Sequence, residues 1–356
     1  MNAHTKTIAW VGGCFFMPSM AEQGFRTVAL PLTKPEALDY DDIVARCGCE
    51  PDAVVYTDRS LPPPLLGVER FPCLTAFYCI DSHIHSWYPL YAGCFDLCAV
   101  SLRDHVDRFA RELSHKRVLW LPPFASDHYQ TRQADKDLDL LFVGTVNPQT
   151  TPQRCDFLAR LGARFPGLAV RQGDFRELMP RARVVLNIAE RGDLNFRVFE
   201  ALACGSCLLT PRLEHGQDEL FEAGVHLETY TSDDDAHCAD KALALLASAP
   251  RREALAQAGL ASVEAAHRAT HRAAAFAALL RQGFDDDLAA KRLAANQPTF
   301  DDAGVHTAEA NSRPAHDARA QALRLMWLHW SEHCGDAALA GRYLAEARRH
   351  STRGRR

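Results

Sequence analysis

The sequence lacks two features that would place a protein in a membrane or on nucleic acid. It has no run of about 18 apolar residues, the length at which a helix begins to span a bilayer. It also has no basic excess, because 40 Lys and Arg stand against 45 Asp and Glu, for a net charge of −5. A nucleic-acid-binding domain usually concentrates positive charge on one face. We therefore expect no transmembrane segment and no nucleic-acid partner.

A secretory signal is also missing from the first residues, which contain one lysine and a single short apolar run. The run IAWV (8–11), followed by two glycines, is more typical of a first buried strand. We therefore expect a cytoplasmic protein whose thiols stay reduced.

The twelve cysteines lack the spacing of a zinc site. Only Cys204 and Cys207 form a CxxC pair, and there is no second pair to complete four ligands. Free cysteine commonly behaves as a small buried hydrophobic residue. We predict structural or incidental cysteines and no metal ion.

Two glycine-containing turns follow predicted buried strands, at Gly12–Gly13 and at Gly144–Thr145. Glycine in such a turn lets backbone N–H groups approach phosphate oxygens closely, although most such turns hold no ligand. Neither turn completes GxGxxG or GxxxxGK[ST], which disfavours a nicotinamide cofactor and a P-loop ATPase.

Short apolar runs alternate with helical patterns, such as 152–165, along most of the chain. This alternation is typical of a parallel sheet with helices on both faces. It restarts after the polar stretch 126–137, which predicts two Rossmann-like domains, 1–130 and 131–283. The predicted strands are 7–11, 27–30, 53–57, 74–80, 97–100 and 118–121 in the first domain, and 138–144, 168–172, 183–189, a short strand beginning at Leu208 and 225–230 in the second.

The C-terminal part differs in composition. Residues 284–316 are poor in large apolar side chains and rich in Asp, Ala, Asn and Pro, which predicts a partly disordered linker. The last segment, 317–356, ends in a basic tail and contains two predicted amphipathic helices within 320–350, similar to a tetratricopeptide-type hairpin. One hairpin cannot bury its own apolar face, so we expect it to dock on the main body or on a protein partner.

The stretch GDLNFRVFEALACGSCLLTP (192–211) carries an acid and a base on one predicted helix. Arg197 and Glu200 lie three residues apart in an apolar run that Asp193 or Asn195 can cap. One interpretation is an ordinary i,i+3 surface ion pair. The other places the helix N-terminus at a diphosphate, with Arg197 as a fixed cation and Glu200 accepting hydrogen bonds from a ribose diol.

This stretch and the following GQDELFEAGVHLETYTSDDD resemble the C-terminal half of GT-B glycosyltransferases. The sequence is most similar to the CgeB-like, or spore-maturation-protein-like, group, which is related to the retaining group 1 transferases. The likeness covers 138–282, continues more loosely over 70–125, and leaves out the tail beyond 284. It implies an α/β fold of the GT-B type, with two Rossmann-like doubly wound domains facing a cleft, to which a C-terminal helical hairpin is added.

The resemblance also implies roles for single residues. Glu200 matches the second acid of the family's E-x7-E motif, which is associated with the nucleotide ribose, while Gly192 stands where the first acid would lie. Arg197 is the first candidate for the diphosphate and Arg154 a weaker one. The other predicted substrate-binding residues are Asn195, Gly144, Thr145, Gly12, Gly13, Glu219 and Gly216.

Asp81 and His83 follow the predicted strand 74–80 and are the candidate catalytic residues. Ligands of open α/β sheets bind at the carboxyl ends of the strands. Group 1 transferases often carry a His after this strand, near the donor sugar and acceptor. In the alternative interpretation, Asp81 caps the next helix and His83 is an ordinary strand-end residue. A metal pair formed by His83 and His85 would lack a third ligand.

The sequence therefore predicts a glycosyltransferase that moves a sugar from a nucleoside-diphosphate sugar to an acceptor hydroxyl of a glycan, a protein or a cell-surface component. The resemblance implies retention at the anomeric carbon and no metal or other cofactor. The Asp runs 233–235 and 285–287 are interpreted as helix caps and solvated charge. The rival interpretation is a non-catalytic protein of the same fold that binds nucleotide or glycan and acts through its C-terminal hairpin.

Overall fold

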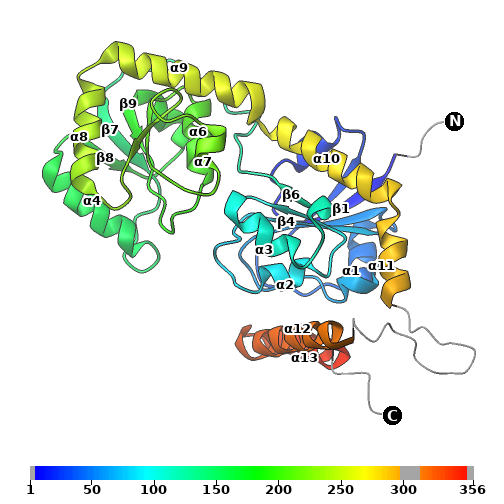
Figure 1. Ribbon diagram of the computed structural model, residues 1–356. Coiled ribbons are helices and arrows are strands. Elements are labelled where there is room, and N and C mark those ends of the chain that lie inside the picture. Colours follow the sequence, from blue (N-terminus) through cyan, green and yellow to red (C-terminus); the bar gives the residue numbers. More distant parts are fainter. Residues whose placement is uncertain (1–4, 297–312, 351–356) are drawn as a thin grey trace, which may run out of the picture. The chain divides into compact units, whose positions relative to one another are not determined.

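The computed structural model describes residues 5–296 and 313–350, and the chain divides into two units (Figure 1). The first unit contains the residues up to Ser101, then His105–Leu121, and the described residues from Ala273 onward. The second unit contains Leu102–Asp104 and Pro122–Arg272. The first unit is therefore built from both ends of the chain, and the second almost entirely from its middle.

A six-stranded sheet forms the centre of the first unit, with the strand order β2-β1-β3-β4-β5-β6. All neighbouring strands in it are parallel, and every strand predicted for this half of the chain is present. The strands are β1 (Thr7–Gly12), β2 (Arg26–Pro31), β3 (Ala53–Thr57), β4 (Leu74–Cys79), β5 (Leu97–Val100) and β6 (Val118–Trp120).

Successive side chains of a strand point to opposite sides of the sheet, and the apolar side chains on each side need a cover. Helices provide this cover on both faces. On one side, α10 (Ala269–Asp285) places Phe276 with its ring centroid 5.9 Å from that of Trp10. On the other side, strand residues such as Val54 and Tyr56 share a core with the shorter helices. These helices are α1 (Tyr40–Cys47), α2 (Tyr88–Ala92) and α3 (Val106–Ala110).

The second unit contains a five-stranded parallel sheet with the order β11-β10-β9-β7-β8. Its two faces carry separate buried clusters, one containing α6 and the other α4 and α8. The strands are β7 (Leu138–Val143), β8 (Leu168–Arg171), β9 (Ala182–Leu186), β10 (Leu208–Pro211) and β11 (Glu228–Tyr230). The helices are α4 (Pro152–Arg164), α5 (Phe175–Leu178), α6 (Phe196–Ala203), α7 (Gln217–Leu220), α8 (Asp235–Leu246) and α9 (Ala249–Ala266).

Part of the predicted linker 284–316 is helical instead. The helix α10 continues to Asp285, and α11 (Leu288–Asn296) follows it directly. The sequence of α11, LAAKRLAAN, consists mostly of strong helix formers, which the low content of large apolar residues concealed. Arg292 holds the helix to the first unit through hydrogen bonds with Asp96 and with three backbone carbonyls. The rest of the predicted linker, 297–312, lies outside the described residues, as does the basic tail from 351.

The predicted C-terminal hairpin is present, as α12 (Arg313–His333) and α13 (Ala337–Arg349). It docks on the first unit, which is one of the two outcomes expected from its apolar face. Trp327 is 2% exposed and Tyr343 is fully buried, and both belong to the core cluster that also contains strand residues of the sheet. The Tyr343 hydroxyl donates to the carbonyl of Pro63 over 3.2 Å. No helix among the described residues is long and apolar enough to cross a membrane.

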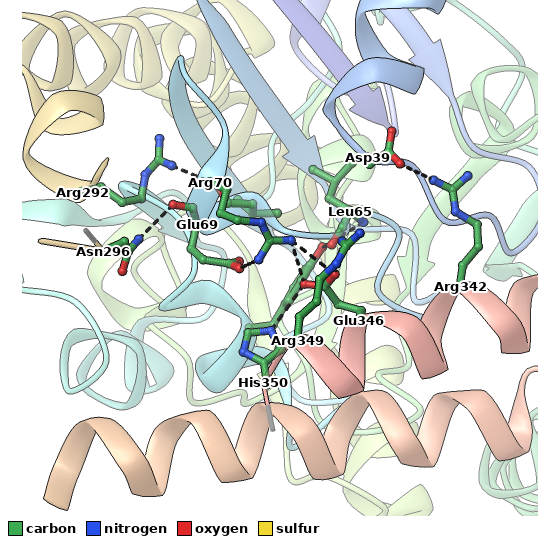
Figure 2. Close-up of polar contacts among 12 residues, drawn as sticks. Asp39, Leu65, Glu69, Arg70, Arg292, Asn296, Arg342, Glu346, Arg349 and His350 are labelled. Atoms are coloured by element: carbon green, nitrogen blue, oxygen red, sulfur yellow. Dashed lines mark hydrogen bonds and ion pairs between the residues drawn. The ribbon is translucent and has the colours of Figure 1, made fainter. Parts of the chain in front are cut away.

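Polar contacts complete this docking (Figure 2). Arg342 of α13 donates to Asp39 over 2.8 Å and to Asp42 over 2.6 Å, at the N-terminus of α1. Glu346 is fully buried, and its carboxylate lies 3.3 Å from a guanidinium nitrogen of Arg70 and 2.8 Å from one of Arg349. The hairpin is therefore held to the first unit by ion pairs as well as by its apolar face.

Acid should weaken this docking. Burial by itself would raise the pKa of Glu346, but a hydrogen bond with His350 and the cations Arg70 and Arg349 lower it to about 2. A depressed carboxyl pKa contributes stability that is complete above the unfolded value, about 4.5, and is lost as the pH falls toward 2. We expect Glu346→Gln to lower the free energy of unfolding at pH 7 and to flatten its pH dependence below pH 4.5. Urea unfolding followed by tryptophan fluorescence measures both, and an unchanged pH slope would contradict the assignment.

Candidate active site

The N-terminus of α6 is not capped by a side chain. Asn195 holds the N-cap position but makes no capping hydrogen bond, and its Oδ1 is buried without a partner among the described residues. The first turn contains Arg197 and no acid. A cation at a helix N-terminus opposes the helix dipole, so this turn is arranged unfavourably unless an anion lies beside it.

Three longer helices of the second unit, α4, α8 and α9, do not share this feature. The carboxylate of Glu190 accepts hydrogen bonds from two backbone N–H groups at the start of α4, those of Gln153 and Arg154. Asp234 caps α8 and Ser248 caps α9 through their side chains. Among these helices of the described chain, α6 is therefore the one whose N-terminal N–H groups are left for a ligand.

Arg197 and Glu200 form the ion pair that their spacing allows. Arg197 Nη1 lies 3.0 Å from Glu200 Oε2, an ionic contact whose geometry does not make a hydrogen bond. The side chains are only 23% and 16% exposed, so the pair differs from an ordinary surface pair. Burial raises the pKa of Glu200, and the charge of Arg197 acts in the opposite direction.

Two aromatic residues that the sequence did not indicate lie beside this pair. The Arg197 guanidinium carbon is 5.0 Å from the ring centroid of Phe175, and Phe175 packs edge-on against Tyr129 at 5.0 Å. Burial raises the pKa of Tyr129, and the nearby charge of Glu200 raises it further. We call Tyr129, Phe175, Arg197 and Glu200 the α6 cluster. Its members come from three separate segments, which is why a local pattern could not reveal all of them.

Gly192, which replaces the first acid of the family motif, occupies a left-handed turn with a φ of 76°. An added Cβ there would meet nothing within 4 Å, so the backbone conformation and not the available space favours glycine. A glutamate at this position would carry conformational strain.

The loop between β7 and α4 is tied together by Arg154. Its Nη1 donates to the carbonyl of Thr145 over 2.9 Å, and its Nε lies 3.8 Å from Glu190. Burial lowers the pKa of Arg154, with the charge of Glu190 acting in the opposite direction. The backbone N–H of Gly144 donates to Arg171 in the neighbouring strand over 3.1 Å, whereas Thr145 is exposed. Arg154 and Glu190 also line a cavity of about 280 Å³ beyond the carboxyl ends of β10 and β11.

The loop between β10 and α7 contains the other two predicted residues of this unit. Gly216 holds the N-cap position of α7 with a left-handed φ of 89°. Glu219 is more than half exposed and pairs with Arg103 over 3.4 Å. The side chain of Gln217 is buried, and its Nε2 has no hydrogen-bond partner among the described residues.

The Gly12–Gly13 turn packs tightly against β3 of the first unit. An added Cβ on Gly12 would lie 2.1 Å from the carbonyl oxygen of Thr57, which requires glycine there. The Gly13 carbonyl accepts from the Thr57 hydroxyl over 2.5 Å and from the Trp10 indole over 2.8 Å. An added Cβ on Gly13 would lie 2.1 Å from the Phe15 ring, so packing within the fold itself accounts for both glycines.

A buried carboxylate, Asp58, organises the carboxyl ends of β3 and β4. It is 2% exposed, and it accepts from the Tyr88 hydroxyl over 2.5 Å and from the backbone N–H groups of Ser60 and Asp81 over 2.7 and 3.0 Å. Burial raises its pKa, and the hydrogen bonds act in the opposite direction. Asp58 follows a predicted strand just as Asp81 does, so the same sequence signal could have indicated it.

Asp81 and His83 both lie just past β4. Asp81 accepts a hydrogen bond from the Ser60 hydroxyl, which fixes its carboxylate. The Nδ1 atom of His83 is buried and has no partner in the described part of the chain. His85 instead stacks on Trp87, with ring centroids 5.4 Å apart. Among the described residues, no group of three side chains that could hold a metal ion includes Asp81, His83 or His85.

The Asp run 233–235 caps a helix as predicted, and it also forms ion pairs that were not predicted. Asp234 accepts from the backbone N–H of His237 over 2.9 Å at the start of α8. Asp235 pairs with Arg160 over 2.9 Å and with Arg164. These acids therefore stabilise the N-terminus of α8.

Residues 139–278 match the family model described as glycosyl transferase-like. The match covers 140 of the 356 residues. The matched stretch contains α6 with Arg197 and Glu200, the loop that holds Gly144, and the β10–α7 loop. No curated protein matches the sequence.

Solved structures show the fold of the chain. Anabaena Alr3699/HepE, solved in complex with UDP and glucose, matches with a TM-score of 0.56 and 12% identity over 78% of this chain and 100% of that one. Sucrose-phosphate synthase from Thermosynechococcus elongatus matches with a TM-score of 0.55 and 11% identity over 79% and 100%. At these identities the likeness concerns the fold alone, which is GT-B. S. aureus TarM also matches, with a TM-score of 0.48 and 8% identity over 64% of this chain. The match spans about half, 55%, of the TarM chain.

Proposed function

We propose that the protein transfers a glycosyl group from a nucleoside-diphosphate sugar to an acceptor hydroxyl. The observation that carries this proposal is the uncapped N-terminus of α6 with Arg197 in its first turn, inside a glycosyl transferase-like domain. The free N–H groups and the guanidinium together suit a diphosphate, the group that leaves in such a reaction. The complex of HepE with UDP and glucose shows that this fold can hold such a ligand.

In this proposal, each group of the α6 cluster has a chemical role. Arg197 stabilises the charge that develops on the leaving diphosphate, and Glu200 accepts hydrogen bonds from the ribose diol. Phe175 offers an aromatic surface beside them. Because fixed cations and helix N–H groups carry out the stabilisation, the reaction needs no metal ion or other cofactor. We further propose that the protein is of the CgeB-like type and retains the anomeric configuration.

Asp81 and His83 are the proposed groups of the first unit that act on the sugar and the acceptor. The buried, unpartnered Nδ1 of His83 supports this role, because an unsatisfied buried nitrogen is costly unless a substrate group binds it. Asp58 positions the backbone of Asp81 and is not proposed to touch the substrate. The acceptor is a hydroxyl of a glycan, a protein or a cell-surface component.

Glu200→Gln should weaken nucleoside-diphosphate binding by about 1–3 kcal/mol, the usual loss when a hydrogen bond to a charged group is weakened. Calorimetric titration with UDP, GDP and dTDP measures the change. Glu253→Gln, an exposed position on α9, is the matched control and should bind like the unsubstituted protein. Equal affinities of both variants for the nucleoside diphosphate would show that Glu200 only forms a structural ion pair with Arg197.

Arg197→Ala should weaken the binding of a nucleoside diphosphate by about 1.5–3 kcal/mol, because a charge-assisted contact is lost. The same substitution should change the binding of the bare nucleoside much less, since the nucleoside has no phosphate. The ratio of the two losses in calorimetry tests the role directly. Equal losses for both ligands would show that Arg197 shapes the site without contacting the diphosphate.

Incubation with UDP-, GDP- and dTDP-sugars, without an added acceptor, tests the proposed activity as a whole. A transferase should hydrolyse its own donor slowly and should be stabilised by it, by about 2.7 kcal/mol at 100 times the dissociation constant. Stabilisation without any release of the diphosphate would favour the non-catalytic interpretation. No effect of any of these nucleotides would contradict donor binding.

A further inference from the structure

A cavity of about 690 Å³ in the first unit is lined by six arginines. They belong to segments far apart in the sequence: the turn before β4, the start of β6, α11, and both helices of the C-terminal hairpin. We call this cavity the arginine pocket, after Arg70, Arg117, Arg292, Arg319, Arg348 and Arg349.

The arginine pocket lies at the amino-terminal edge of the six-stranded sheet. Asp96 directly precedes β5, Arg117 directly precedes β6, and both line the cavity. Asp81 and His83 lie past the carboxyl end of β4, at the opposite edge of the same sheet. A ligand in this pocket would therefore occupy a different place from the reacting sugar.

The arginines outnumber the acids around them. Three carboxylates of the described residues lie in or against the pocket, and each is already paired. Figure 2 shows two of them, Glu69 and Glu346. Asp96 pairs with Arg292 over 2.9 Å, and Glu346 is shared by Arg70 and Arg349. Among the described residues, the lining therefore carries more guanidinium groups than carboxylates, in a chain whose net charge is −5.

Two of the six arginines have no acidic partner among the described residues. Neither Arg117 nor Arg319 forms an ion pair with any residue that the structure describes, and both are half-buried. Arg319 is held in place, because its guanidinium lies against Gly93, where an added Cβ would be 1.9 Å from its Nη2. Burial raises the pKa of the Cys94 thiol to about 12, and the nearby Arg319 acts in the opposite direction. Partly buried, unpaired guanidinium groups carry a desolvation penalty that a bound anion would remove.

A metal ion fits this place less well than an anion. Glu69, Glu346 and His350 offer three ligand atoms within 4.8 Å of one another. However, Arg70 and Arg349 already contact the Glu346 carboxylate and would repel a second cation there.

We propose that the arginine pocket binds a ligand that carries a diphosphate group, at a site separate from the donor site. The forked guanidinium matches phosphate oxygens in two parallel hydrogen bonds, and two guanidinium groups without an acidic partner among the described residues, those of Arg117 and Arg319, suit more than one phosphate. The volume lies within the range of small-ligand pockets. Because the pocket is lined by α11, α12, α13 and the edge of the sheet, the ligand joins the hairpin to the body of the first unit.

Calorimetric titration of the full chain with inorganic pyrophosphate tests the proposal. Arg117→Gln/Arg319→Gln should weaken this binding at least tenfold. The control Arg111→Gln/Arg324→Gln removes the same charge at two exposed positions, one of them on α12, and should bind like the unsubstituted protein. Arg197→Ala should leave binding to the pocket intact, which separates this site from the proposed donor site.

A second measurement uses only the unsubstituted protein, so it does not depend on whether a variant folds. Pyrophosphate should slow amide hydrogen exchange in α12 and α13 of the unsubstituted protein, because the ligand would hold the hairpin in place. Repeating both measurements with UDP shows whether a nucleoside diphosphate or free pyrophosphate is the better ligand. Pyrophosphate binding that persists in Arg117→Gln/Arg319→Gln, or hairpin exchange that pyrophosphate leaves unchanged, would overturn the proposal.

Discussion

His83→Ala should lower the turnover of sugar transfer by about 100-fold or more, while the affinity for the nucleoside diphosphate stays near normal. A positioned general acid or base typically contributes about 10²–10⁴ to the rate. The structure supports a role in chemistry, because Nδ1 of His83 is buried and has no partner in the described chain. A nitrogen so placed can bond to a substrate hydroxyl without first giving up an internal contact.

The kinetics separate this role from a structural one. Turnover and donor affinity should be measured for His83→Ala beside His115→Ala, which changes an exposed histidine of the same unit. The control should keep normal turnover and normal stability. Normal turnover with a lowered melting temperature in His83→Ala would show that this histidine serves only the fold.

Arg292→Ala should reduce the stability of the first unit by about 3–5 kcal/mol, the cost of breaking a buried ion pair by removing one partner. Arg292 is 10% exposed and Asp96 1%, and two nitrogens of Arg292 donate to Asp96 over 2.9 and 3.1 Å. Three further hydrogen bonds reach the carbonyls of Val68, Phe71 and Cys73. Asp96 would keep its bonds to Thr75 but would remain a buried charge without a cation.

Tryptophan fluorescence can follow this unfolding selectively. All five tryptophans lie in the first unit, so the signal does not report on the second. Lys291→Ala, an exposed neighbour on the same helix, is the control and should change the stability by less than about 0.5 kcal/mol. A similarly small effect of Arg292→Ala would mean that the pair contributes little beyond its own desolvation cost.

The parallel strands were predictable because each is buried on both faces and therefore reads as a continuous apolar run, as in Ala53–Thr57. The Arg197–Glu200 pair was predictable because its spacing is local to one helix. Tyr129 and Phe175 were not, since they reach this helix from distant segments. A local pattern carries no information about such contacts.

Residues 297–312 of the predicted linker lie outside the described residues, but its first part, 284–296, shows why the prediction from composition was wrong. Residues 288–296 contain few large apolar groups, and their helix is held by Arg292 to an acid almost 200 residues earlier in the chain. The hairpin was a simpler case. Its amphipathic pattern required a covering surface, but only the structure shows that the first unit supplies it, at Trp327 and Tyr343.

The order in which the two units can fold during synthesis follows from how the chain divides. The second unit is almost continuous, so it can fold as soon as Arg272 has left the ribosome. The first unit cannot complete its core then, because Phe276, Trp327 and Tyr343 are still to be made. Its sheet must wait with an uncovered apolar face through the synthesis of the last quarter of the protein. We expect this interval to be when the nascent chain depends most on chaperones, and we expect C-terminal truncations to aggregate through the first sheet while the second unit stays folded.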